Sequence, residues 1–168
     1  MGILTSCCAT LYGAGGGAQA AMILDPDMQP LVVKNANGGI VSFGIIYVNR
    51  KEGYAVVNNF EVHKAYSDLT EEIHHKAMKG IDAFVKQYNK ENVDKPIKIV
   101  TCGLSPNWRA LNEYIQKNPE SILLDAPNFN DFKYIGTGSW KGDWFKSQYI
   151  IWCSDDDLKN QLIKNKSK

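Results

Sequence analysis

The sequence predicts a single α/β domain with a mixed, mostly antiparallel central sheet and flanking helices. Three β-rich runs follow one another at residues 31–34, 40–48 and 54–62, separated by short turns, which is typical of an antiparallel meander. Over residues 70–90 the apolar period changes to that of an amphipathic α-helix. A short apolar strand follows at residues 97–102. Because a helix connects it to the preceding strand, we expect these two strands to run parallel.

Length and composition fit one globular domain and exclude several function classes. The chain has 168 residues, 44% of them hydrophobic and 22% charged, which is enough for one core. The formal charge of +1 gives no overall field for nucleic acid or an anionic membrane. No apolar run approaches the ~18 residues of a membrane-spanning helix. The four cysteines lack metal-ligand spacing, so we expect buried thiols in a reducing, cytoplasmic compartment and no metal site.

The first thirty residues form a lead-in with weak structural signals. The run Gly13–Ala18 matches the G-x-G-x-x-A pattern of dinucleotide-binding turns. Such a turn opens a crossover helix, but Asp25, Pro26 and Asp27 break the chain too soon after it. We therefore interpret this run as a flexible loop.

Local signals refine the predicted elements in the first half of the chain. The nearly continuous apolar run Ile40–Val48 indicates a central strand buried on both faces. Gly53 suits a turn that needs a positive φ. Asn58–Asn59 is unusual within a strand, which indicates either the lining of a cleft or a β-bulge. Asp68 or Thr70 is expected to cap the helix that follows.

The second half of the chain is predicted from shorter patterns. A second helix spans residues 105–118, and β-rich segments follow at 122–125, 132–135 and 144–153. The terminal strands are expected to pair as a hairpin across a glycine-broken, mobile loop. Residues 154–168 are expected to form a polar helix or tail.

This order of elements resembles the GNAT superfamily of acyl-coenzyme A-dependent N-acyltransferases over residues 31–152. Two sites carry the likeness. The first has the N-x-R-A-x-x-x-Y spacing of the motif after the family's fifth strand, and comprises Asn107, Arg109, Ala110 and Tyr114. The second, Phe60–His63, lies where the family's fourth strand leads to its pyrophosphate-binding loop. The resemblance implies a GNAT-like fold, with acetyl-coenzyme A (acetyl-CoA) as cofactor.

The resemblance also implies which residues contact the cofactor. Val62, Asn107 and Ala110 match cofactor-binding positions of the family. The family's Gln/Arg-x-x-Gly-x-Gly/Ala turn, whose N–H groups bind the pyrophosphate, corresponds here to Ser67, Asp68, Leu69, Thr70, Glu71 and Glu72. Both glycines and the basic lead residue are missing from this turn. Its three acidic side chains oppose an anion at the helix N-terminus by ~1 kcal/mol for each close pair.

Acyl transfer to an amine requires a base, an acid and a donor for the developing oxyanion. The resemblance places the thioester in the gap between the fourth and fifth strands and gives Tyr114 the role of the acid. Glu61 is a candidate base, directly or through water, and His63 is the alternative. His74 and His75 are consecutive and project about 100° apart on a helix, so they cannot chelate a metal together.

Two hypotheses stay open. The first is an N-acyltransferase that acts on a small-molecule or peptide amine, with neither nucleic acid nor membrane as a partner. The second is a catalytically inactive GNAT-like binding or interaction module. The motif that ends at Tyr114 favours the enzyme, whereas the altered turn favours the module. Residues 1–30 are too few for the strand and two helices with which the family begins, which indicates a reduced lead-in or a fragment of a longer protein.

Overall fold

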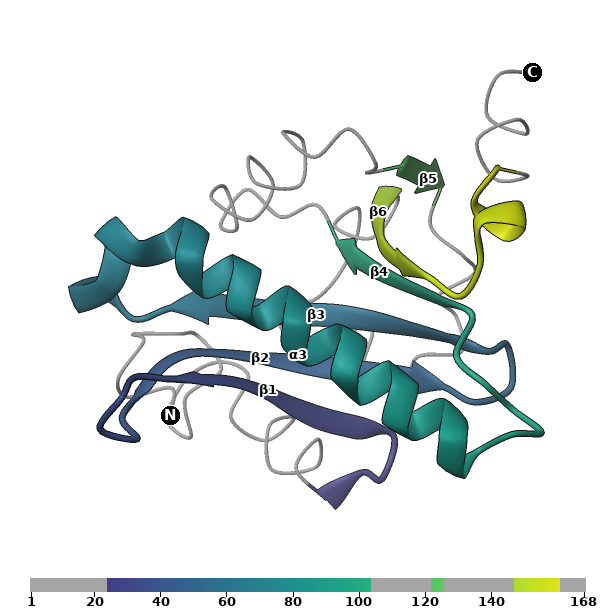
Figure 1. Cartoon of the computed structure of the whole chain (residues 1–168), viewed down its shortest axis with the longest axis horizontal. Helices are drawn as coiled ribbons and strands as arrows, with labels where there is room; N and C mark the ends of the chain where they lie inside the picture. The colour runs from purple at the N-terminus through teal and green to yellow at the C-terminus, as the bar shows by residue number, and fades with distance from the viewer. Residues whose placement is uncertain (1–23, 104–121, 126–146, 161–168) are drawn as a thin grey trace.

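The computed structural model describes residues 24–103, 122–125 and 147–160, which form a six-stranded sheet crossed by one long helix (Figure 1). The elements are β1 (Met28–Lys34), β2 (Ile40–Asn49), β3 (Tyr54–Val62), the 3-10 helix η1 (Lys64–Leu69), α3 (Thr70–Glu91), β4 (Ile99–Gly103), β5 (Ile122–Asp125) and β6 (Ser147–Cys153). The strand order is β1-β2-β3-β4-β6-β5. Within these ranges only β3 and β4 pair in parallel, so the predicted mixed, mostly antiparallel sheet is confirmed.

Several predicted bounds agree with the structure, but β1 begins earlier than the predicted residue 31, at Met28, and one strand begins later than predicted. The strand predicted at 97–102 starts at Ile99. Ile97 is instead held by Asn89 of α3, whose Oδ1 accepts from the Ile97 N–H at 2.7 Å and whose Nδ2 donates to the Ile97 carbonyl at 2.8 Å. The helix predicted at 105–118, the strand at 132–135 and the run Gly13–Ala18 lie outside the described residues.

The core lies between α3 and the sheet, because α3 crosses the face of β1, β2 and β3 (Figure 1). The helix buries a stripe at i, i+4 spacing, which comprises Ile73, Ala77, Ile81 and Val85. This stripe packs on strand side chains that include Leu31, Val33, Ile46, Val48, Ala55, Val57, Phe60, Val100 and Cys102. Every β2 residue from Ile45 to Asn49 is buried, which confirms burial of this strand on both faces.

His74, in the second turn of α3, is a polar side chain inside this core. It is 2% exposed, and its ring centroid lies 5.3 Å from that of Phe60 in β3. Burial lowers the pKa of His74 from 6.5 to about 4, so the imidazole is neutral at pH 7. Its neighbour His75 is exposed.

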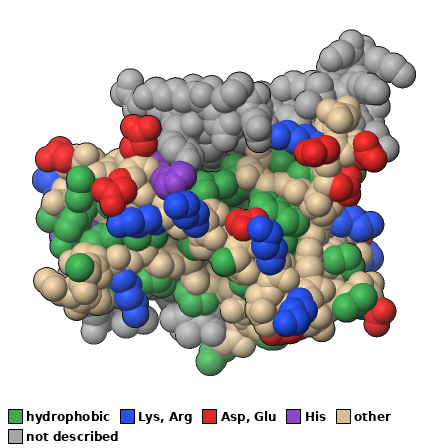
Figure 2. Space-filling view, in the orientation of Figure 1, with side chains coloured by type: hydrophobic (Ala, Val, Ile, Leu, Met, Phe, Trp, Pro, Cys, Tyr) green, Lys and Arg blue, Asp and Glu red, His purple; other side chains and the backbone are tan. Residues whose placement is uncertain are grey.

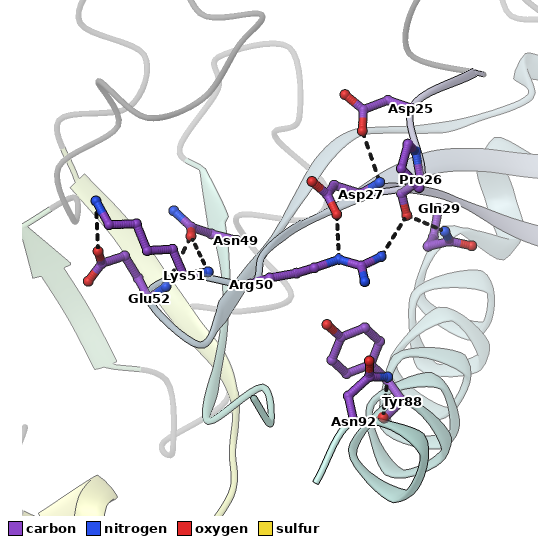
Figure 3. Close-up of polar contacts among 10 residues, drawn as sticks. All are labelled: Asp25, Pro26, Asp27, Gln29, Asn49, Arg50, Lys51, Glu52, Tyr88 and Asn92. Carbon is purple, nitrogen blue, oxygen red and sulfur yellow. Dashed lines mark hydrogen bonds and ion pairs between the residues drawn. The ribbon is translucent and has the colours of Figure 1, made fainter. Parts of the chain in front are cut away.

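A polar cluster fastens the β2–β3 turn to the start of β1 and to the end of α3 (Figure 3). The Arg50 Nε donates to Asp27 Oδ1 at 2.5 Å, and Arg50 Nη2 donates to the Pro26 carbonyl at 3.3 Å. The guanidinium carbon also lies 6.0 Å from the centroid of the Tyr88 ring. We call the end of the sheet that contains the β2–β3 turn the closed end.

The β2–β3 turn itself depends on Asn49 and Gly53. The buried Asn49 accepts the N–H groups of Lys51 and Glu52 through Oδ1, both at 3.1 Å. Gly53 has a φ of 72°, as predicted, and its N–H donates to the Asn49 carbonyl at 2.9 Å. The Gly53 carbonyl accepts from the Lys98 N–H at 2.8 Å, which starts the parallel alignment of β3 with β4.

The described cysteines differ in burial. Cys102 is fully buried, which raises the pKa of its thiol to about 12, whereas Cys153 is partly exposed. The prediction of buried thiols therefore holds for Cys102, and Cys7 and Cys8 lie outside the described residues. No helix in the described ranges is long and apolar enough to cross a bilayer.

The first prediction concerns Asn89, which anchors the chain before β4. We expect Asn89→Ala to destabilise the fold by about 2 kcal/mol, because the buried Ile97 N–H and carbonyl both lose their partner. The exposed neighbour Lys90 provides the control, since Lys90→Ala removes no such contact and should change stability by less than about 0.5 kcal/mol. Urea unfolding followed by circular dichroism measures both. Equal stabilities of the two variants would contradict this role.

The second prediction concerns the buried His74. Its pKa is lower in the folded than in the unfolded state, so between about 6.5 and about 4 the unfolded state binds more protons. His74 therefore reduces stability progressively as the pH falls through this window, by up to about 3 kcal/mol, and has no further effect below it.

Unfolding free energies of the wild type, His74→Phe and His75→Gln at several pH values measure this effect. The difference between the wild type and His74→Phe isolates His74 from the carboxylates, which titrate in both proteins. This difference should grow as the pH falls from 6.5 to 4, whereas the exposed His75 should give none. A pH-independent difference for His74→Phe would refute the assignment.

Candidate functional site

Strands β3 and β4 stop pairing well before β3 ends. Their register runs from Tyr54 opposite Ile99 to Val57 opposite Cys102, while β3 continues to Val62. Gly103, the last residue of β4, pairs with β6 but has no partner in β3. Figure 1 shows β4 turning away from β3 toward β6. The predicted parting of the two parallel strands is therefore seen from Val57 onward, and we call Asn58–Val62 the open segment of β3.

The backbone of the open segment presents Val62 to the side that β4 has left. The His63 N–H donates to the Val41 carbonyl at 2.8 Å, and the Glu61 carbonyl accepts from Ser42 Oγ at 2.8 Å. Both residues thus turn their backbone groups toward β2. Successive residues of a strand alternate in this direction, so the N–H and carbonyl of Val62 point away from β2. Among the described residues nothing pairs with this Val62 N–H, and an unpaired strand N–H is the kind of donor that stabilises an oxyanion.

A β-bulge precedes this segment. Ile45 of β2 lies opposite Asn58 of β3, but Phe43 lies opposite Glu61, so Gly44 alone faces the two residues between them. The prediction of a bulge is therefore confirmed for Asn59, which faces Gly44 together with Phe60, whereas Asn58 keeps its regular partner Ile45.

The bulge decides on which face of the sheet Glu61 lies. Before the bulge, Ala55 and Val57 belong to the core under α3. After it, Phe60 and Val62 pack against that core instead, so the extra residue has reversed the alternation. Glu61 consequently lies on the face opposite α3, in register with Phe43, and is partly exposed.

His63 ends the strand and begins the turn that follows it. Its Nδ1 accepts from the Ala65 N–H at 3.1 Å, and its ring meets that of Tyr66 edge-on, with centroids 5.9 Å apart. Because Nδ1 serves as an acceptor, the hydrogen bond assigns the hydrogen of the neutral ring to Nε2. The neutral imidazole then has no free lone pair for a substrate proton, which makes Glu61 the stronger of the two candidate bases.

The turn between β3 and α3 is held by side chains where the GNAT resemblance implies glycines. Tyr66 leaves helical geometry inside η1, with φ −121° and ψ 19°. Its hydroxyl accepts from Asn35 Nδ2 at 3.1 Å, and Asn35 Oδ1 in turn accepts from the N–H groups of Asn37 and Gly39. The β1–β2 turn therefore supports the β3–α3 turn directly.

The start of α3 is acidic and has no side-chain cap. The prediction that Asp68 or Thr70 caps the helix is wrong, because the N-cap is Leu69. The chain enters α3 directly from η1, so the Thr70 N–H and Oγ1 both bond to the Ser67 carbonyl. A side chain at Asp68 is thus not needed to satisfy that first N–H.

The charges of this turn are only partly compensated. Lys76 pairs with Glu72 at 2.7 Å, and this hydrogen bond lowers the pKa of Glu72. In the part of the chain that the structure describes, Asp68 and Glu71 have no ion pair, and both are exposed. Figure 2 shows acidic and basic side chains interspersed on the α3 side of the molecule, so no basic patch there offsets the acidic turn.

The remaining predicted site residues are not placed. Tyr114, Asn107, Arg109 and Ala110 lie outside the described residues, and their roles stay predictions. Over the residues that are described, no group of three or more His, Cys, Asp and Glu side chains could hold a metal ion.

Sequence reasoning missed Gly44, which the structure shows at the centre of the bulge. A Cβ on Gly44 would lie 2.9 Å from Phe60 Cδ2 and 3.2 Å from Phe60 Cα. A glycine inside an otherwise apolar strand often marks a bulge or a close backbone approach, so this signal was available in the Ile40–Val48 run.

Comparisons with known proteins place these features in context. No protein-family model and no curated protein matches the chain. A GNAT-family acetyltransferase from Staphylococcus aureus is a similar solved structure, at 14% identity and a TM-score of 0.47, covering 76% of this chain and 69% of that one. Tetrahymena GCN5 has 13% identity and a TM-score of 0.46, covering 84% and 79%. A variant of spermidine N-acetyltransferase from Vibrio cholerae has 8% identity and a TM-score of 0.42, covering 91% and 78%.

These likenesses concern the fold and not the chemistry. The sheet itself, with its antiparallel meander and its parallel β3–β4 pair that parts beside the start of α3, has the arrangement that the resemblance implied. The described sheet therefore has the strand arrangement that the resemblance predicts, with a β3–α3 turn that diverges from the family's pattern.

Proposed function

We propose that this protein is an N-acyltransferase that moves an acetyl or other acyl group from acyl-coenzyme A to an amine. The main observation that supports this proposal is the open segment of β3. It places a strand residue, Val62, with its backbone N–H directed to the side that β4 has left.

The described residues fit the two ends of acetyl-CoA unequally. The Val62 N–H and carbonyl suit the acyl and pantetheine end, which strand-like hydrogen bonds can hold. The turn Ser67–Glu72 suits the pyrophosphate less well, because only the positive end of the α3 dipole attracts it while Asp68 and Glu71 repel it. When bound, the cofactor supplies the acyl group in activated form, as a thioester.

Residues of this chain carry out the proton transfers and stabilise the developing oxyanion. Glu61 takes the proton of the incoming ammonium, directly or through water, because His63 uses its lone pair on the Ala65 N–H. The Val62 N–H offers the donor that an oxyanion needs. Tyr114 is the proposed acid, since a phenol with a pKa near ~10 stays protonated at neutral pH and can give its proton to a departing thiolate.

The acceptor is proposed to be a small-molecule or peptide amine. The acidic side chains of Glu61, Asp68 and Glu71 favour a cationic substrate over an anionic one. The same acidic, glycine-free turn also favours the second candidate, a GNAT-like binding module without activity. Binding of acetyl-CoA separates the two.

The third prediction tests whether the turn faces the pyrophosphate. Isothermal titration calorimetry should show acetyl-CoA binding, and Asp68→Asn or Glu71→Gln should each tighten it about two- to fivefold, because one repulsive charge is removed. Asp94→Asn is the matched control, since Asp94 is exposed beyond the other end of the 22-residue α3. Each gain should shrink in high salt. No heat at millimolar acetyl-CoA would end the enzyme hypothesis.

The fourth prediction concerns the proton carriers. Glu61→Gln should lower kcat by about 10²–10⁴-fold with little change in acetyl-CoA affinity, because the amide cannot accept the substrate proton. Tyr114→Phe should also slow turnover while it preserves binding. Glu52→Gln, in the β2–β3 turn, is the control and should behave as the wild type. Steady-state kinetics with a panel of amines measures these effects, and full activity of Glu61→Gln would remove its assigned role.

A further inference from the structure

We infer that a stack of Gly44, Phe60 and His74 positions Glu61 for acyl transfer by fixing the bulge in β3. The stack spans three elements, because Gly44 lies in β2, Phe60 in β3 and His74 in α3. Its members act through Glu61 and do not themselves meet the substrate, so they are positioning residues. The catalytic consequence of this inference rests on the proposed function, whereas its structural part does not.

The three side chains fit together with little free space. Phe60 and His74 are 4% and 2% exposed, and their ring centroids lie 5.3 Å apart with planes tilted by 47°. A Cβ at Gly44 would lie 2.9 Å from Cδ2 and 3.2 Å from both Cβ and Cα of Phe60. Two of these contacts involve Cα and Cβ, which cannot move without the strand. The absent side chain of Gly44 thus lets the backbone of β3 approach while His74 holds the Phe60 ring in the core.

This arrangement fixes the direction of Glu61 because side chains alternate along a strand. Val57 and Phe60 both belong to the α3 side, which requires one extra residue between them. If the bulge were lost, Phe60 would leave the core and Glu61 would take the α3 side instead. Its carboxylate would then face an apolar core and lose contact with the site.

His74 contributes shape and not charge to the stack. It is buried against Phe60 in the second turn of α3, which follows the β3–α3 turn directly. An aromatic ring of similar size should therefore replace it, whereas a small side chain should leave Phe60 without support.

The test measures nuclear Overhauser effects (NOEs) between the side chains of Glu61 and Phe43 by NMR, which needs no turnover. The wild type should show these NOEs, because the two residues lie opposite each other on the face away from α3. We expect Gly44→Ala to abolish them, because the altered bulge turns the Glu61 side chain toward the core. Gly80→Ala is the matched control, since a Cβ there meets only Leu31 Cδ1 at an ordinary 3.7 Å. It should leave the NOEs unchanged.

A second pair of variants gives an independent test if Gly44→Ala does not fold. His74→Ala should weaken the NOEs between Glu61 and Phe43 by about twofold or more, and His74→Phe should restore the wild-type intensity. In active protein, kcat should fall in each variant that loses these NOEs, while the affinity for acetyl-CoA changes little. NOEs that are unchanged in folded Gly44→Ala, or in His74→Ala, would overturn the inference. Absence of turnover in the wild type would overturn the proposed function alone, because the NMR measurement would still test the stack.

Discussion

The structure depends on a mismatch in length between two neighbouring parallel strands. β3 extends through Val62, but its ladder with β4 ends at Val57, so its last residues keep their antiparallel partner and lose their parallel one. Backbone N–H and carbonyl groups need partners, and a strand edge without one can bind a ligand in the same way as it binds another strand. Val62 turns its N–H and carbonyl to that edge. The parting of the two strands therefore provides the backbone groups that the proposed acyl donor would bind.

The closed end of the sheet makes this mismatch possible. Arg50 ties the β2–β3 turn to the start of β1, and the Gly53 carbonyl meets the Lys98 N–H where β3 and β4 begin. Asn89 fixes the chain just before β4 from the last turns of α3. On the α3 side of the sheet, Trp152 of β6 donates from Nε1 to Asp82 of α3 at 3.0 Å, so β6, the antiparallel partner of β4, is also tied to α3. Because β3 and β4 are held together only at the closed end, beyond it β4 stays paired with β6 while β3 stays paired with β2.

Local patterns were sufficient to predict the elements but not the contacts between them. The apolar periods set β3 and α3 to within a residue, and the helix between them implied the parallel pairing. The bulge was only one of two alternatives for Asn58–Asn59, because it depends on Gly44 meeting Phe60 across two strands. The cap was predicted wrongly for a similar reason, since η1 satisfies the first N–H of α3 through the backbone. The motif that ends at Tyr114 lies outside the described residues, so half of the candidate site still rests on the resemblance.

The most direct test of this account is an NMR titration of the backbone amides at the end of β3 with acetyl-CoA. Free protein should show fast hydrogen exchange at Val62 and protected amides at Glu61 and His63, which face β2. Saturating acetyl-CoA should shift and protect the Val62 amide and leave those of its two neighbours nearly unchanged. A Val62 amide that is protected without ligand, or that does not respond to saturating ligand, would contradict the claim that β3 presents this edge to an acyl donor.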